Sequence, residues 1–600
     1  MHNAFFSFGD DGKAHFGFKG KELLKGETDG SSYPSGGMRA THTAGGYTVL
    51  DPTSPVFLRG DTVYIPTVFV SFYGQALDEK TPLLRSMTAL SKEGARLCKN
   101  LGYNIGGVQP NIGLEQEYFL VPRSAFYKRL DLQLTGRTIM GKLAPRGQEM
   151  CDHYMGPPNQ IAFECIKEIQ HECFMLGIPL RTRHREVAPN QYECAPLFGI
   201  ATTQIDQNIM VMQIMEEVAA RHGLACLNQE KPFAGINGSG KHNNYSMGTD
   251  TGVNLLNVEQ VTKASGNPEV FGCIMAAIVK AVDEHGDLLR MAIASPGNDF
   301  RLGACEAPPA IVSTYLGDEM TKYLEASKNS KSFKAYNVEG STVDLGVPAI
   351  APFTVPAEDR NRTSPFPYGG HRFEFRAVGS SQNVSMVNTV LCTIFADAFA
   401  TMSDAIEKGA KPADLAAAAL DKHWKVIFNG NGYSDEWPIE AGKRGVWRID
   451  SGVESMKRLS DAKNTELFSK MSVMSKEECD ARTVVMYDHY TGSVEMEALC
   501  MIDMIKQHII PSAKAAEMST AGLEKAVASV EGGLAKVHAG ADEYAKATAA
   551  RELRLETMED ARAVCDKVEA EVPADLWTIA TYKELLFLDA NQGAEISEYE

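Results

Sequence analysis

At 600 residues the chain is too long for a single ordinary hydrophobic core, so two or three domains are expected. Its content of 44% hydrophobic and 23% charged residues is typical of a soluble globular protein. A formal charge of −18 argues against a nucleic-acid or membrane surface, so an anionic substrate would need local arginines or metal ions.

Neither a membrane span nor a signal peptide is expected. The longest apolar helix candidate, VFGCIMAAIVKAV from Val270, is too short to span a bilayer and carries Lys280. The N-terminus has no charged, apolar and small-residue layout of a signal peptide. The twelve cysteines include no CxxC pair, so reduced thiols and a cytoplasmic location are predicted.

The first 80 residues contain signals for strands and turns. HFGF, YTVL and TVYIPTVFVSF are rich in β-branched and aromatic residues, and the Gly/Ser-rich run GETDGSSYPSGG separates the first two. This pattern predicts a small β domain over residues 1–80. A helix with an apolar 3.6-residue period is expected to begin at Thr81 and Pro82 and to link this domain to the next.

Strands and helices alternate beyond this linking helix. The pattern predicts an α/β or α+β domain with strands at 112–121, 179–187 and 191–198 and helices at 158–176 and 203–222. Helical signals dominate after about residue 400. The segment 512–570 is rich in Ala, Glu and Lys and predicts a helical appendage with a role in packing or assembly.

The stretch GLEQEYFL, residues 113–120, places two carboxylates in an otherwise apolar run. Because side chains alternate between the faces of a strand, Glu115 and Glu117 are expected on the same face. Like charges side by side raise each other's pKa unless a cation lies between them. The pattern fits either an edge strand with a solvated face or a hard-metal site that takes further oxygen ligands from elsewhere.

Two further stretches supply partners for such a site. RHREVAPNQYECAPLF carries Glu186 and Glu193 on either side of a Pro-Asn turn, so two adjacent strands are expected to carry them. KPFAGINGSGKHNNYS, residues 231–246, carries His242 after a glycine-rich loop whose backbone N–H groups suit an anion. The alternatives are a surface hairpin and a structural histidine.

The stretch HRFEFR, residues 371–376, alternates Arg372, Glu374 and Arg376 on one face of a predicted strand. A salt-bridge ladder is the simple interpretation. Together, however, five glutamates and one histidine lie on strands or adjacent loops of one region. Such oxygen-dominated ligation suits Mg²⁺ or Mn²⁺, and this number of ligands suits two ions.

Two divalent ions beside several arginines are suited to phosphoryl transfer, because both neutralise phosphate oxygens. The chain has no GxxxxGK[ST] motif and no protein-kinase motif set. A nucleotide would therefore be held by a different fold.

The order of these motifs resembles glutamine synthetase, and in detail the long type III branch of that family. The matching stretches, in order, are GETDGSS, GLEQEYFL, HREVAPNQYE, KPFAGINGSGKHNNYS, RLGACEAPPAI and NRTSPFPYGGHRFEFR, and the likeness continues through YSDEWPIEAGKRGVWRID. The resemblance implies an α+β chain: a β-grasp domain over 1–80 whose first part is missing, a catalytic domain with a curved antiparallel sheet over 81–510, and a helical region over 511–600. It also implies a homo-oligomer, a dodecamer of two hexameric rings with active sites between subunits.

The family implies ATP-dependent ligation of ammonia to L-glutamate through γ-glutamyl phosphate, giving glutamine, ADP and phosphate. By motif, the resemblance implies that the ion nearest glutamate is bound by Glu117, Glu186 and Glu193. It implies that the ion at the ATP phosphates is bound by Glu115, His242 and Glu374. The glutamate-binding positions are Asn237, Gly238, Arg301 and Arg376, and the nucleotide-side positions are Asn244, Ser246 and Arg372.

Three catalytic positions are also implied. Arg362 resembles the arginine that stabilises the transferring phosphoryl group, and Glu306 the flap glutamate that closes over the intermediate and helps bind ammonium. Asp29 resembles the aspartate that deprotonates ammonium from the neighbouring subunit. A closed flap would also keep water from hydrolysing the acyl phosphate.

Two positions differ from relatives outside the type III branch. Residues 365–368 occupy the stretch where those relatives carry a second arginine, so fewer guanidinium groups are expected to hold phosphate. Asn244 stands where they often have a second histidine, and its amide hydrogen-bonds without titrating.

Two other functions remain open. A ligase that uses an amine other than ammonia would need an open, apolar wall in place of the acidic pair Asp29 and Glu306. An inactive relative with a structural or regulatory role would show losses among the six metal-ligand positions, and all six are filled.

Overall fold

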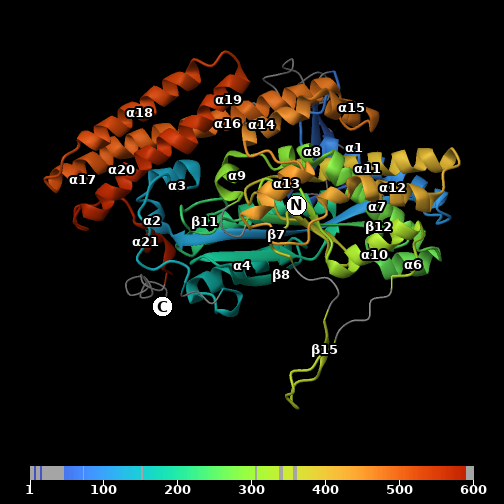
Figure 1. The fold of residues 1–600 in the computed structure, drawn as a ribbon. Helices are drawn as coiled ribbons and strands as arrows, with labels where there is room; N and C mark the ends of the chain where they lie inside the picture. The colour runs from blue at the N-terminus through green and yellow to red at the C-terminus, as the bar shows by residue number, and fades with distance from the viewer. Residues whose placement is uncertain are drawn as a thin grey trace.

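A computed structural model describes residues 6–8, 14–16, 46–71, 73–149, 153–303, 307–336, 342–355 and 361–588 of the chain. Two of the predicted catalytic residues, Asp29 and Glu306, lie outside these ranges. The helices and strands are shown in Figure 1.

The N-terminal strands form three short antiparallel pairs. β1 (Phe6–Phe8) pairs with β2 (Ala14–Phe16), β3 (Gly46–Leu50) with β6 (Thr67–Ser71), and β4 (Phe57–Arg59) with β5 (Thr62–Tyr64). Arg59 at the end of β4 forms ion pairs with Glu172 and Glu217 at 3.2 and 2.5 Å. These pairs attach the β4–β5 hairpin to two helices of the following region.

A seven-stranded antiparallel sheet is the centre of that region. Five strands run in the order β17, β12, β7, β9 and β8, and β10 and β11 also pair with β7. Their bounds are Val108–Pro122 for β7, Leu180–Arg185 for β8, Gln191–Pro196 for β9, Gly199–Ile200 for β10, Leu224–Leu227 for β11, Lys241–Thr249 for β12 and Phe373–Phe375 for β17. The predicted strands at 112–121, 179–187 and 191–198 are thus confirmed as β7, β8 and β9.

Long helices cover one face of the sheet. On this face the alternate residues of β7 are apolar and pack against the helices. Leu114 packs in a core with α1 (Lys80–Asn100), α7 (Glu269–Glu284) and α11 (Ser385–Glu407). Tyr118 and Leu120 pack in a second core with α4 (Gln160–Met175) and α5 (Ala201–Arg221). The opposite face of β7 is therefore the one that carries Glu115 and Glu117.

Helix α11 is the one helix among the described residues that is long and apolar enough to cross a membrane. In its apolar 18-residue stretch, 78% of the helix is buried inside the protein. Its residues belong to the main core, with Val387, Leu391 and Phe395 fully buried. A core helix of this kind accounts for its apolar composition.

The C-terminal helices gather at one end of the molecule (Figure 1). Helix α16 (Lys476–Met504) begins with a capping box formed by Ser475 and Glu478. Helices α18 (Ala521–His538), α19 (Glu543–Glu552) and α20 (Met558–Glu571) pack with it around a separate core, with π-helical turns η5 (Ile505–Ile509) and η6 (Leu553–Thr557) between them. The predicted helical content of 512–570 is confirmed.

The chain then returns from these helices to the sheet. Helix α21 (Tyr582–Leu586) begins with a second capping box, at Thr581 and Glu584, and lies beside α2 (Arg123–Phe126) and β11 in Figure 1. Tyr582, Leu585 and Leu586 are buried against apolar residues of β7 and β11. Helix α21 is thus part of the core of the sheet region.

Several shorter elements connect these parts. A hairpin of β14 (Thr342–Val343) and β15 (Phe353–Thr354) extends away from the body (Figure 1). The remaining elements are α3 (Leu130–Thr135), α6 (Val258–Ser265), α8 (Gly286–Ala292), α9 (Pro296–Arg301), α10 (Asp318–Ser330), α12 (Pro412–His423), α13 (Glu436–Arg444), α14 (Gly452–Met456), α15 (Ala462–Lys470), α17 (Ile510–Ala515), β13 (Thr314–Tyr315), β16 (Phe366–Pro367) and the 3₁₀ turns η2 (His153–Met155), η3 (Trp424–Val426) and η4 (Lys457–Ser460).

Candidate active site

The register of the sheet brings the predicted metal ligands together. His242 on β12 lies directly opposite Glu115 on β7, and Glu117 lies opposite Glu193 on β9. Glu374 on β17 lies opposite Asn244 on β12. Glu186 directly follows β8, and its backbone N–H donates to the carbonyl of Gln191 at 2.8 Å. All six predicted ligands therefore reach one region of one sheet face.

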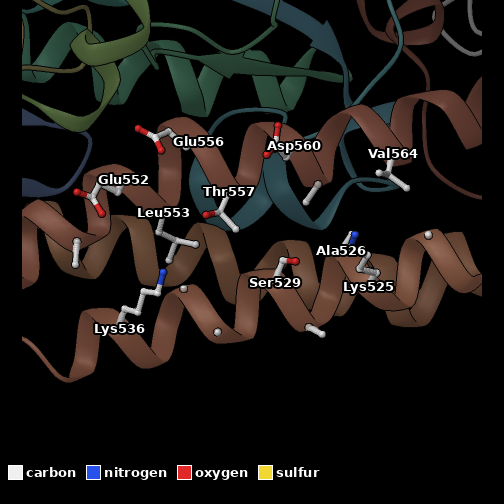
Figure 2. Close-up of a pocket in the computed structure, with 16 residues that line it drawn as sticks. Lys525, Ala526, Ser529, Lys536, Glu552, Leu553, Glu556, Thr557, Asp560 and Val564 are labelled. Carbon is white, nitrogen blue, oxygen red and sulfur yellow. The ribbon is translucent and has the colours of Figure 1, made fainter.

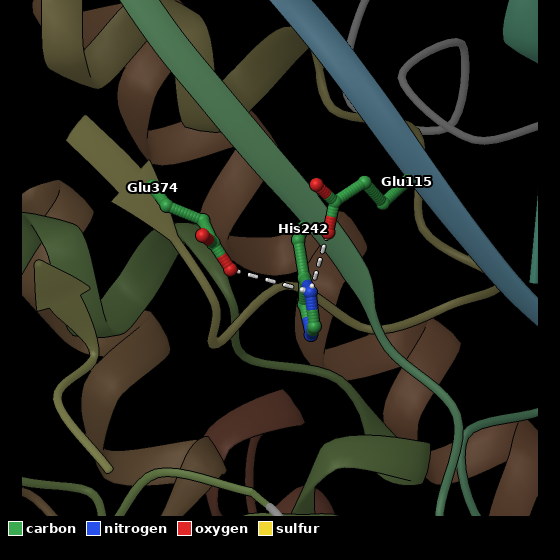
Figure 3. Close-up of side chains that lie close together, drawn as sticks. All are labelled: Glu115, His242 and Glu374. Carbon is green, nitrogen blue, oxygen red and sulfur yellow. Dashed lines mark hydrogen bonds and ion pairs between the residues drawn. The ribbon is translucent and has the colours of Figure 1, made fainter. Parts of the chain in front are cut away.

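His242 is the centre of the first group of ligands. Its Nδ1 lies 3.0 Å from a carboxylate oxygen of Glu115 and 3.4 Å from one of Glu374. Figure 3 shows the three side chains pointing toward one another from three different strands. One ligand atom of each lies within 4.8 Å of the others, close enough for a single metal ion.

Glu193 joins the other two groups. Glu117, Glu193 and His242 form the second, in which His242 Nε2 lies 3.4 Å from a Glu117 oxygen. His184, Glu186 and Glu193 form the third, with His184 Nε2 at 3.2 Å from Glu186 and 2.7 Å from Glu193. Because the groups share His242 and Glu193, the five carboxylates form one continuous cluster.

His184 is a member of this cluster that the sequence analysis missed. It lies opposite Glu193 in the β8–β9 register and precedes Glu186 by two residues. Strand alternation places residues two apart on the same face, so the pattern HRE offered a signal. Hydrogen bonds to Glu186 and Glu193 raise the pKa of His184 to about 10.

The electrostatics of the cluster reflect an excess of carboxylates. Burial raises the pKa of Glu117 and raises the pKa of Glu193 to about 8. Burial alone would also raise the pKa of Glu115, but the hydrogen bond and charge of His242 lower it to about 2. A set of buried oxygens with too few cations around it fits a divalent metal ion, which favours the ionised form of each ligand.

Arg301 and Arg376, two predicted glutamate-binding residues, lie against each other. Arg301 Nη1 donates to the carbonyl of Val378 at 3.1 Å, and its Nη2 donates to that of Arg376 at 3.1 Å. Arg376 Nη1 donates to Glu374 at 2.9 Å, so the arginines adjoin the metal-ligand cluster. Both side chains are buried, with 2% and 8% of each residue exposed.

Glycine is required beside Arg301. A Cβ at Gly238 would lie 2.6 Å from the carbonyl oxygen of Glu230 and 3.1 Å from Arg301 Cγ. A Cβ at Gly240 would collide with the Arg301 guanidinium. The glycine-rich run NGSGK therefore lets the guanidinium lie directly on the backbone.

Two buried donors in this area are without a hydrogen-bond partner among the described residues. They are Asn237 Nδ2 and Arg376 Nε. Two other polar atoms of Asn237 are held by Gln148, which donates to Asn237 Oδ1 at 3.0 Å and accepts from its backbone N–H at 2.7 Å. Buried donors of this kind are normally paired, so both suit a carboxylate of a bound substrate.

The predicted nucleotide-side residues connect to the same cluster. Asn244 Nδ2 donates to Glu115 at 2.9 Å, while its Oδ1 accepts from Arg372 Nε at 2.6 Å. Ser246, two residues further along β12, donates to the carbonyl of Asn111 at 3.5 Å. Asn244 therefore holds Arg372 next to a metal ligand.

Arg362 reaches the cluster through an aromatic residue that sequence reasoning missed. Its Nη1 donates to Tyr154 Oη at 2.9 Å, and its guanidinium lies 4.8 Å from the centroid of the Tyr154 ring. The Tyr154 ring packs edge-on against His184 at 5.2 Å. Tyr154 thus connects Arg362 to the third ligand group.

A hollow of about 670 Å³ lies elsewhere, between α18 and the segment η6–α20 (Figure 2). Its walls carry Lys525 and Lys536 on one side and Glu552, Glu556 and Asp560 on the other. It contains none of the predicted site residues. This hollow is therefore separate from the carboxylate cluster.

Comparison with known proteins places the chain, with its antiparallel sheet and acidic cluster, in a class of enzymes, the glutamine synthetases. Family models match for the glutamine synthetase type III N terminal (residues 1–86), the glutamine synthetase catalytic domain (95–286) and the glutamine synthetase C-terminal domain (413–529). The chain belongs to the type III branch of the glutamine synthetase family.

Relatives match along most of the chain. The type-3 glutamine synthetase of Dictyostelium discoideum is 43% identical over 524 residues, covering 85% of this chain and 71% of that protein. The glutamine synthetase of Bacteroides fragilis is 40% identical over 523 residues, with the same coverage, and that of Butyrivibrio fibrisolvens is 36% identical over 570 residues, covering 88% and 80%. A solved structure described as a GmaS/ADP complex is 17% identical with a TM-score of 0.45, covering 75% of this chain and 82% of that chain, which is too distant to inform the site.

Proposed function

We propose that the chain ligates ammonia to L-glutamate with ATP, through γ-glutamyl phosphate, giving glutamine, ADP and phosphate. One observation carries the proposal. Six predicted ligands from separate stretches of the sequence converge into one cluster, which adjoins the buried pair Arg301 and Arg376. Membership of the family supports the same conclusion.

The donor set fits two divalent ions, Mg²⁺ or Mn²⁺. We assign Glu117, Glu186 and Glu193 to the ion nearest glutamate, and Glu115, His242 and Glu374 to the ion at the ATP phosphates. When bound, such ions neutralise phosphate oxygens and polarise the phosphorus toward attack. The excess of buried carboxylates supports this assignment.

The chain's own residues bind and orient the two substrates. Asn237, Gly238, Arg301 and Arg376 hold the amino-acid ends of glutamate, and the two buried unpaired donors support this role for Asn237 and Arg376. Asn244, Ser246 and Arg372 hold the nucleotide. Holding both substrates in this way turns the reaction into one between fixed groups, which lowers its entropic cost.

The chemistry has two steps. An oxygen of the glutamate γ-carboxylate attacks the γ-phosphorus of ATP and ADP leaves, and Arg362 stabilises the charge of the transferring group. Ammonia then attacks the γ-carbonyl carbon of the acyl phosphate, phosphate leaves with the bonding electrons, and the nitrogen loses one proton to give the neutral amide. Asp29 removes the proton from ammonium and Glu306 closes over the site, two roles that rest on their motifs.

The proposal extends to organisation and location. Residues 1–80, 81–510 and 511–600 form the β-grasp domain, the catalytic domain and the helical region, and the protein is a cytoplasmic dodecamer of two hexameric rings. The role given to Asp29 supports sites shared between subunits. The ten described cysteines, all free, support a reducing compartment.

The direct test is phosphate release by the purified chain. With Mg²⁺ and ATP, release is expected only when both glutamate and ammonium are present. Release with a polyamine but not with ammonium would instead show a ligase for larger amines. Loss of turnover under every condition, with metal still bound, would show an inactive relative.

A further inference from the structure

The short helix α9, which ends at Arg301, is held from outside the sheet by the C-terminal helices. Glu497 on α16 accepts from Arg137 Nε and Nη2, both at 2.8 Å. It also accepts from Arg554 Nε at 2.7 Å and from Arg554 Nη2 at 2.9 Å. One carboxylate therefore binds two guanidinium groups, each through two hydrogen bonds.

This triad of Arg137, Glu497 and Arg554 is buried. The side chains are 5%, 3% and 0% exposed. Burial alone would raise the pKa of Glu497, but the two arginines lower it to about 2, so the carboxylate is ionised. Buried ions of this kind are costly unless paired and hydrogen-bonded, which gives the triad a fixed geometry.

The triad contacts a residue of α9. Both guanidiniums lie over the ring of Phe300, and the Cζ atoms of Arg137 and Arg554 are each 4.5 Å from its centroid. Arg554 Nη1 also donates to the carbonyl of Pro296, the first residue of α9. The triad thus holds both ends of a helix of only six residues.

The rest of α9 is fixed from both sides. Tyr490 on α16 donates to Asp299 at 2.6 Å, and the backbone N–H of Gly452 donates to the same carboxylate at 3.2 Å. On the sheet side, Asn298 Nδ2 donates to the carbonyl of Ala377 at 3.0 Å. Arg301 follows Phe300 directly, so any displacement of Phe300 moves the guanidinium that lies on Gly240.

We propose that Glu497, Arg137 and Arg554 are positioning residues for Arg301, and that the C-terminal helices take part in glutamate binding by holding Phe300. Arg554 lies in the π-helical turn η6, a rare geometry that is frequently found at functional sites. The inference rests on the proposed function, because it takes Arg301 to bind glutamate.

The test compares the KM values for glutamate and for ATP in the full-length protein. Glu497→Gln keeps the shape of the side chain but removes its charge, and it is expected to raise the glutamate KM about tenfold while the ATP KM changes less than about twofold. Phe300→Leu leaves the triad intact and removes the ring that both guanidiniums contact. It is expected to raise the glutamate KM selectively as well.

Val530→Ala is the matched control, because Val530 is fully buried in the core of the same helices. It is expected to lower stability without changing the ratio of the two KM values. Equal rises in both KM values, or effects of Glu497→Gln and Phe300→Leu no larger than that of Val530→Ala, would overturn the inference. If Glu497→Gln does not fold, the KM values of Phe300→Leu alone test the inference.

Arg301→Lys separates this inference from the proposed function. If Arg301→Lys raises the glutamate KM but Glu497→Gln and Phe300→Leu do not, the positioning role is wrong and the proposed function stands. If Arg301→Lys leaves the glutamate KM unchanged, the assignment of Arg301 to glutamate is wrong.

Discussion

Glu117 and Glu193 lie directly opposite each other on neighbouring strands, an arrangement that a sheet normally avoids. Like charges in a cross-strand pair are destabilising. Burial adds to the effect by raising the pKa of both groups. A site that binds cations explains why the two carboxylates lie together. The effect of the pair on the free energy of unfolding of the metal-free protein can be measured.

Glu193→Gln is expected to leave the metal-free protein as stable as the parent or about 1 kcal/mol more stable, because a carboxyl group whose ionisation is opposed by burial is replaced by a neutral group of the same shape. The same change is expected to weaken Mn²⁺ binding by at least about tenfold, because a ligand is lost. Calorimetric unfolding with and without Mn²⁺ measures both. A metal-free variant that is several kcal/mol less stable would show that Glu193 is simply a structural ion-pair partner.

Gly240 gives a second prediction at this scale. In Gly240→Ala the new methyl group meets the Arg301 guanidinium, so the glutamate KM is expected to rise about tenfold with the fold retained. Gly532→Ala in α18 is the control, because its Cβ meets nothing within 4 Å and the change is expected to stabilise the helix by about 0.5–1 kcal/mol. An unchanged glutamate KM in Gly240→Ala would contradict the placement of Arg301.

Strand alternation is the element-scale feature that could be predicted from the sequence. Glu115, Glu117 and Glu374 were predicted on the correct faces, because a two-residue period is a local property of the chain. His242 was predicted on a loop-adjacent position and lies on β12 itself. Tyr154 and Gln148 carried no comparable signal, since their roles depend on partners far away in the sequence, such as Arg362 and Asn237.

The contacts of helix α21 also depend on partners far away in the sequence. Tyr582 Oη lies 2.7 Å from Thr138 Oγ1, a partner 444 residues earlier in the chain. It also accepts from the backbone N–H of Ala234 at 3.1 Å and from Arg562 Nη2 at 2.8 Å. The family resemblance implied a helical region over 511–600, but no local pattern indicates which surface a C-terminal helix will contact.

Tyr582→Phe is therefore expected to destabilise the protein by about 1–3 kcal/mol, because three polar groups, two of them in buried hydrogen bonds, lose their common partner. The free energy of urea unfolding measures the loss. Tyr544→Phe is the matched control. The Tyr544 hydroxyl donates to Glu454 at 2.9 Å, and Tyr544 is less buried than Tyr582. Equal effects of the two changes would contradict the idea that α21 is locked to the loop before Asn237.

At the scale of the whole molecule, stability should depend on a buried histidine outside the site. Burial and the neighbouring Lys463 lower the pKa of His285 to about 4, below its ordinary value of 6.5. Between these two pH values the unfolded chain binds a proton that the folded chain does not. The free energy of unfolding therefore falls as the pH falls from 6.5 to 4, by about 3 kcal/mol at most from this group.

His285→Gln is expected to reduce that pH dependence, measured as the change in unfolding free energy between pH 6.5 and 4.5. His171→Gln, at an exposed position on α4, is expected to leave the dependence unchanged. The same slope in the parent and in His285→Gln would show that the histidine does not control acid stability.

The central claim is that the carboxylate cluster binds two divalent cations beneath ATP. Titration of the purified chain with Mn²⁺, followed by the paramagnetic signal of the free ion, counts the sites directly. Two sites per chain are predicted, with Glu117→Gln affecting one and Glu115→Gln the other. Binding that is undiminished when both glutamates are replaced would contradict the account.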